Sequence, residues 1–87
     1  MELRIEVPDC GDALRFEWDE GFTIAVSVDE GGQVLISANN AGLVSLARHL
    51  LTLAQDGAGP GAHLHLTAGQ EIDGDHDLVL ERSSRAT

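Results

Sequence analysis

The chain has 87 residues, the length of one small domain, and 43% of them are hydrophobic. Fifteen acidic residues against five basic ones give a formal net charge of −10. This charge argues against nucleic acid and anionic membranes as partners, because both are polyanions, and it permits a basic protein partner. The N-terminus, MELRIEVPD, has neither the basic nor the apolar region of a signal peptide, so we expect a cytoplasmic protein.

Residues 1–38 read as an acidic β-meander. Apolar and polar residues alternate over 3–7, 14–18 and 22–28, and with the short, mainly apolar run 34–38 they predict four short strands. Asp-Glu-Gly sequences at 19–21 and 29–31 are typical of the turns that join antiparallel strands. Phe16 and Trp18 share one strand face and are expected in the core, although Trp18 could also anchor an interface.

Residues 39–56 predict an amphipathic helix. One face carries a leucine stripe, which we expect to pack on the sheet: Leu43, Leu46, Ala47, Leu50, Leu53 and Ala54. The opposite face is expected to be solvated and carries Ser45, Arg48, His49, Thr52 and Asp56. Asn39 or Asn40 can cap the start of the helix, and Gly57 suits a left-handed position at its end.

Two further strands are expected at 62–67 and 77–82, separated by a polar loop and followed by a frayed tail at 83–87. The complete prediction is a single domain, 1–87, of the α+β class. It has an antiparallel sheet of about six strands with one helix packed on one face.

His63 and His65 are the first candidates for chemistry. Residues i and i+2 of a strand point the same way and lie about 6.5–7 Å apart, so two imidazoles could share a metal ion. A third ligand could come from Glu71, Asp73, Asp75, His76 or Asp77. The surrounding spacing partly imitates a cupin motif but lacks its glycine and its second half. We therefore expect no metal and no cofactor, and keep solvent exposure and partner recognition as the other interpretations.

The remaining motifs do not predict an enzyme. Asp73, Asp75 and Asp77 alternate as calcium ligands do, but the glycine falls at the second position of the loop rather than the sixth. Neither His49 nor His76 has a nucleophile at a recognised spacing.

The block from Ile36 to Leu66 resembles a bacterial family of polymorphic toxin systems, immunity protein 32. The similarity lies in I-x-A-N, in G-L-x-x-L-A-x-H-L-L-x-L-A and in G-x-H-x-H-L. The residues that carry it are Ile36, Ala38, Asn39, Gly42, Leu43, Leu46, Ala47, His49, Leu50, Leu53, Ala54, Gly61, His63, His65 and Leu66. Thr67 stands where family members often have an aspartate.

The resemblance implies a small non-enzymatic α+β protein that binds and neutralises a cognate toxin, which we expect to be basic. Candidate contact residues are His63, His65, His49, Arg48 and Trp18, together with unspecified acids. Two alternatives are a small metal-binding domain that uses His63 and His65, and a homo-oligomeric module whose sheet edge pairs with another copy.

Overall fold

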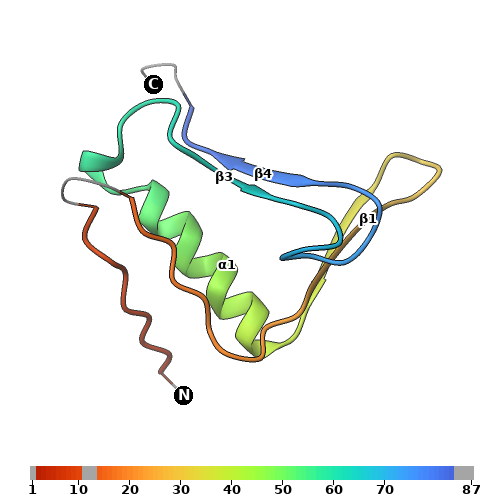
Figure 1. Cartoon of the computed structure of the whole chain (residues 1–87), viewed down its shortest axis with the longest axis horizontal. Coiled ribbons are helices and arrows are strands. Elements are labelled where there is room, and N and C mark those ends of the chain that lie inside the picture. The colour runs from red at the N-terminus through yellow and green to blue at the C-terminus, as the bar shows by residue number, and fades with distance from the viewer. Residues whose placement is uncertain (1, 11–13, 84–87) are drawn as a thin grey trace.

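The computed structural model describes residues 2–10 and 14–83. Along the chain lie β1 (Ile24–Val28), β2 (Val34–Ala38), α1 (Asn40–Leu53), the short 3-10 turn η1 (Asp56–Ala58), β3 (His63–Leu66) and β4 (Leu78–Glu81). The fold is α+β, with α1 between an extended N-terminal segment on one side and the β3–β4 hairpin on the other (Figure 1). Of the predicted tail at 83–87, only Ser83 lies within the described residues.

The described strands form two antiparallel hairpins. β1 pairs with β2 from Ile24 opposite Ala38 to Val28 opposite Val34, and β3 pairs with β4 along its whole length. The loop that precedes β4 links the two hairpins, because Asp73 exchanges backbone hydrogen bonds with β1. Its N–H donates to the Ile24 carbonyl at 2.8 Å, and its carbonyl accepts from Val26 at 3.1 Å. One small core therefore serves both hairpins.

The prediction of one sheet with about six strands was wrong. Among the described residues there are two sheets of two strands each, and 3–7 and 14–18 are not strands. These residues belong to the N-terminal segment, which we define as residues 2–10 and 14–23 and which runs extended along α1 (red to orange in Figure 1). The period-two alternation survives in part of its burial, since Ile5, Val7 and Phe16 are half-buried while Glu6 and Glu17 are exposed. Alternation reports an extended backbone, whatever that backbone binds to.

The expected helix is confirmed, with an earlier end. Asn39 is the N-cap, its Oδ1 accepting the Gly42 N–H at 2.8 Å. The helix ends at Leu53, and the backbone is extended again at Gln55. The prediction that Gly57 closes the helix in a left-handed conformation was wrong, because Gly57 lies within η1 without a positive φ.

The core consists of Ile24, Val26, Leu66 and Ile72. Half-buried apolar side chains surround it: Trp18, Phe22, Ala38, Leu46, Leu64 and Leu78. Leu46 of the predicted stripe therefore packs as expected, and Leu53 is buried as well.

The rest of the helix is turned the other way from the prediction. The buried residues of α1, which we call the inner helix face, are Gly42, Ser45, His49, Thr52 and Leu53. Leu43 and Leu50 are 53% and 54% exposed, so the leucine stripe as a whole does not seal the core. The face with hydroxyl and imidazole groups is covered instead, because the N-terminal segment lies on it and needs polar partners for its backbone.

Gly42 brings α1 into close contact with the chain at Thr23 and Ile24, where β1 begins. A Cβ on this residue would lie 2.3 Å from the Thr23 carbonyl oxygen, far inside contact distance. We expect Gly42→Ala to lower the free energy of unfolding by about 3 kcal/mol or more, since backbone rather than a flexible side chain must move. Urea unfolding followed by circular dichroism measures this loss.

Gly31→Ala is the matched control. Its new methyl group would meet only Asp29 Oδ1 at 3.5 Å, an ordinary contact. Its unfolding free energy should stay within about 0.5 kcal/mol of the parent value. Equal losses in the two variants would contradict the close approach of α1 to β1.

Candidate partner-binding surface

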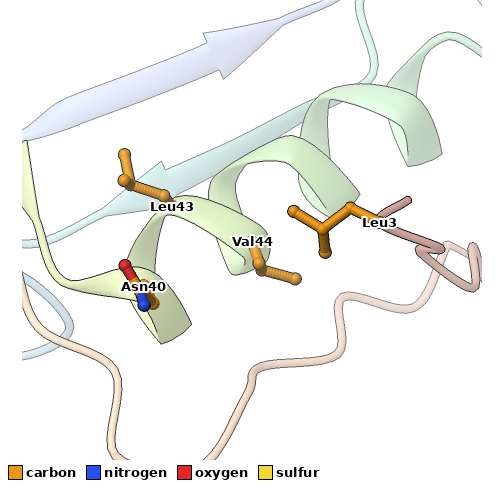
Figure 2. A pocket seen from close by; sticks show the side chains of 4 residues that line it. All are labelled: Leu3, Asn40, Leu43 and Val44. Atoms are coloured by element: carbon orange, nitrogen blue, oxygen red, sulfur yellow. The ribbon is translucent and has the colours of Figure 1, made fainter. Parts of the chain in front are cut away.

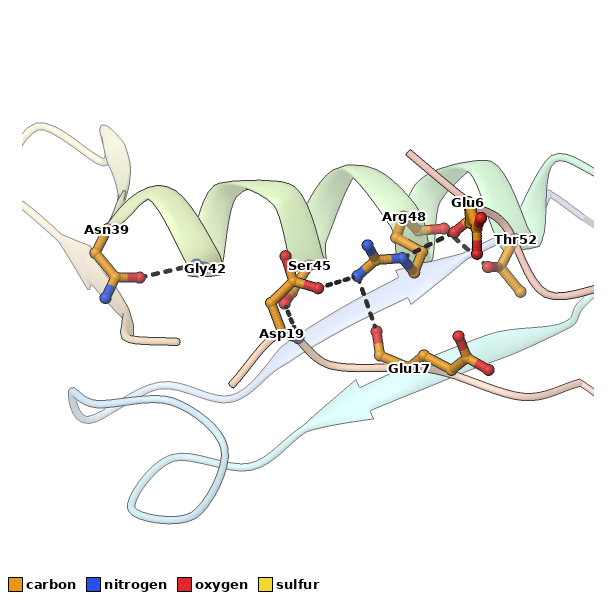
Figure 3. A network of polar contacts seen from close by, with 8 residues as sticks. All are labelled: Glu6, Glu17, Asp19, Asn39, Gly42, Ser45, Arg48 and Thr52. Atoms are coloured by element: carbon orange, nitrogen blue, oxygen red, sulfur yellow. Dashed lines mark hydrogen bonds and ion pairs between the residues drawn. The ribbon is translucent and has the colours of Figure 1, made fainter. Parts of the chain in front are cut away.

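Arg48 binds the N-terminal segment to α1. Its Nε donates to the Glu6 carbonyl at 2.9 Å, and its Nη1 donates to the Glu17 carbonyl at 3.4 Å (Figure 3). The same Nη1 forms an ion pair with Asp19 Oδ1 at 2.6 Å, with the arginine side chain only 13% exposed. A guanidinium group suits this position because it presents several donors in a fixed plane. Arg48, predicted to contact a partner, is occupied within the fold.

Ser45 and Gln55 bind the same segment. The Ser45 hydroxyl accepts the Asp19 N–H at 2.9 Å. Gln55 uses both ends of its amide: Oε1 accepts the Cys10 N–H at 3.3 Å and Nε2 donates to the Pro8 carbonyl at 2.8 Å. Side chains of α1 and of Gln55, just after it, thus satisfy backbone groups that a neighbouring strand would otherwise satisfy.

Asn39 extends this arrangement beyond the helix. Besides capping α1, its Oδ1 accepts the Thr23 N–H at 3.0 Å, and its Nδ2 donates to the Gly21 carbonyl at 2.9 Å. A single amide therefore fixes both the start of α1 and the turn that leads into β1.

His49 lies at the centre of the inner helix face and is completely buried. Its ring meets Trp18 edge-on at 4.3 Å and Phe16 at 5.5 Å. Neither ring nitrogen has a hydrogen-bond partner among the described residues. Burial, with a smaller contribution from the Arg48 cation and against the opposing effect of Asp19, lowers the pKa of His49 to about 4. The prediction of a solvated His49 was wrong, because the aromatic side chains of the N-terminal segment cover it.

Trp18 is half-buried and stacks on Phe22, with ring centroids 4.4 Å apart. It packs against the core, which is one of the two roles that the sequence suggested for it, the other being an interface anchor. Three of the five candidate contact residues, Trp18, Arg48 and His49, therefore join the N-terminal segment to the helix.

His63 and His65 are exposed on β3 and alternate with the inward-facing Leu64 and Leu66. His65 Nε2 lies 2.9 Å from Asp77 Oδ2, and His63 Nδ1 lies 3.2 Å from the Gly61 carbonyl. The strand brings both imidazoles to the surface as expected.

The acidic loop after β3 uses its carboxylates to hold its own backbone. The Thr67 N–H donates to Glu71 and thereby lowers the pKa of Glu71. The Ala68 N–H donates to Asp77 and, together with His65, lowers the pKa of Asp77. Over residues 2–10 and 14–83, no three His, Cys, Asp or Glu side chains gather in a way that could hold a metal ion.

The outward side of α1 is apolar. We define the outer helix face as Leu43, Val44, Ala47, Leu50 and Leu51, of which the three leucines are exposed and the other two half-buried. Leu3 of the N-terminal segment joins Asn40, Leu43 and Val44 around an open pocket of about 350 Å³ (Figure 2). Sequence reasoning missed this surface, although its signal, the leucine stripe, was plain, because we assigned the stripe to the core.

The fold and this surface define a small α+β protein whose helix exposes apolar side chains of the kind that mark protein–protein contacts. The family model of Immunity protein 32 matches residues 33–83, and the chain belongs to this family. The match confirms the resemblance read from the sequence. No curated protein and no solved structure matches the chain significantly. In the described part of the chain, no helix is long and apolar enough to span a membrane.

Arg48→Ala tests how the N-terminal segment is held. We expect about 2 kcal/mol less stability, because the change leaves two carbonyls and the Asp19 carboxylate without their shared donor. Hydrogen exchange should accelerate in residues 2–10 and 14–19. Arg4→Ala, which removes only an exposed ion pair with Glu2, should change stability by about 0.5 kcal/mol or less. An unchanged exchange pattern in Arg48→Ala would refute this role.

His49 should make stability depend on pH. Between pH 6.5 and about 4 the unfolded chain protonates this residue while the folded chain does not. The unfolded state then binds more protons, so stability falls as the pH is lowered through this window, by ~3 kcal/mol at most. His49→Leu should remove this component without destabilising the protein at pH 7.5, since no hydrogen bond is lost.

Urea midpoints measured from pH 8 to pH 4 test the prediction. His76→Leu, at an exposed position, should keep the parent pH dependence. If His49→Leu and the parent protein lose stability in parallel, another group is responsible.

Proposed function

We propose that this chain is an immunity protein that neutralises a cognate bacterial toxin by stoichiometric binding, without catalysis, in the cytoplasm. The observation that carries the proposal is the family match over residues 33–83. The match covers β2, α1, β3 and β4 and leaves out β1. A protein of this kind needs a stable scaffold and one complementary surface, and it needs no reactive centre.

The charge of the chain supports the same function. A net charge of −10 produces a field that accelerates encounter with a basic partner and disfavours other acidic proteins. Toxins that cleave nucleic acid have basic surfaces because their substrate is a polyanion. An acidic inhibitor gains association rate against such a toxin.

Co-expression with the product of the adjacent gene tests the proposal. The chain should restore growth of cells that produce the toxin, and titration of the purified toxin should reach complete inhibition at about one equivalent. The association rate constant should fall as salt is raised, because screening shortens the range of the attraction. Gly42→Ala, which disturbs the scaffold, should protect less well.

Two results would refute the function. One is that no neighbouring gene product is toxic, or that a toxic one is not neutralised. The other is inhibition at far less than one equivalent, which would indicate that the chain acts catalytically on the toxin.

A further inference from the structure

We propose that the outer helix face, with Leu3 beside it, is the surface that receives the toxin. Its occupant is an apolar segment of the toxin flanked by basic side chains. This inference rests on the proposed function and goes beyond it by naming the binding surface and the chemistry of the segment bound there.

The first support is the inverted arrangement of the helix. The inner helix face buries the hydroxyl groups of Ser45 and Thr52 and the imidazole of His49, whose ring nitrogens have no hydrogen-bond partner among the described residues. The outer helix face exposes Leu43, Leu50 and Leu51. Apolar burial by itself would favour the opposite orientation, since each of these half-exposed leucines forgoes about 1 kcal/mol, roughly half of what full burial of a leucine contributes. A partner that covers these leucines recovers this free energy of burial.

The second support is the pocket at one end of this face. Leu3, Leu43 and Val44 form its apolar walls, and Asn40 adds an exposed amide at its rim (Figure 2). A volume of about 350 Å³ is enough for one large apolar side chain. Pockets that accept one anchor residue next to a flat apolar area are where interface energy is concentrated.

The third support is the distribution of charge, which decides what kind of partner fits. Arg48 is the only charged residue between Gly31 and Gln55, and it is bound to the N-terminal segment. Acidic residues begin again at both ends of α1. Asp56 follows the helix, and Glu20 lies in the turn that Asn39 holds at its start. An uncharged apolar centre with acids at its ends complements an apolar segment with basic neighbours.

The same distribution disfavours a second copy of the chain as the occupant. Two copies joined at this surface would bring Glu20 and Asp56 of each near the acidic ends of the other, with a net charge of −10 on both. The histidine pair offers a weaker surface, because His65 is already engaged by Asp77 and only Val79 is a large exposed apolar residue on that hairpin.

The test compares Leu43→Ser/Leu50→Ser with Val79→Ser. Val79 is 49% exposed on β4, close to the exposure of the two leucines. Each variant is titrated with a catalytically inactive form of the toxin found by co-expression, in a calorimeter or on a biosensor. The double variant should bind on the order of 100-fold more weakly, chiefly through faster dissociation, and the Val79 variant by less than about threefold.

The acidic ends have their own prediction. Glu20→Gln/Asp56→Asn should slow association several-fold at low salt and leave dissociation nearly unchanged. Circular dichroism confirms folding of each variant. If the double serine variant does not fold, Leu50→Ser alone should weaken binding about tenfold.

The outcomes separate the two proposals. If the parent chain binds the toxin and the folded serine variants bind equally well, the surface assignment is overturned and the immunity function stands. If the parent chain does not bind any adjacent toxin, the function itself fails. If the parent chain is a dimer that the serine variants dissociate, a second copy covers this face and the assignment to the toxin is overturned.

Discussion

The hydrogen bonds that polar side chains of α1 and of Gln55 form with the backbone of the N-terminal segment are the constraint on which the rest of the structure depends. An extended segment that is not part of a sheet leaves its N–H and C=O groups to be satisfied elsewhere. Arg48, Ser45 and Gln55 supply donors and acceptors for them. These polar side chains must therefore lie between helix and segment, which fixes the rotation of α1 about its own axis and buries His49 beneath Trp18.

The exposed leucines follow from that rotation. The polar face and the leucine stripe lie on opposite sides of α1, so the rotation that turns the polar face inward turns the stripe outward. Only the edge of the stripe, Leu46 and Leu53, still reaches the interior. The four-residue core is correspondingly small, and the outer helix face is left as an exposed apolar surface that suits a partner. One set of internal hydrogen bonds thus connects the scaffold to the proposed toxin-binding surface.

The candidate site was predicted only in part. At β3 the period-two pattern identified the correct faces, since His63 and His65 are exposed while Leu64 and Leu66 face inward. Arg48 and His49 were assigned to a solvated surface because the hydrophobic pattern of a helix identifies two faces without saying what covers either. Backbone carbonyls of an extended segment that lack a strand partner, such as that of Glu6, leave no signal in the sequence. These carbonyls bind Arg48 and thereby decide which face of α1 is covered.

By itself, the sequence determined the α+β class, the positions of β1 to β4, an asparagine cap at the start of α1 and the acidic charge, since each follows from local periodicity, capping chemistry or composition. Its motifs also indicated the family. Only the tertiary structure decided that residues 3–7 and 14–18 lie on the helix rather than in a sheet. It also decided which helix face is inside. The physical reason is that apolar burial and backbone hydrogen bonding compete for the same helix face, and the competition is settled by contacts between residues far apart in the chain.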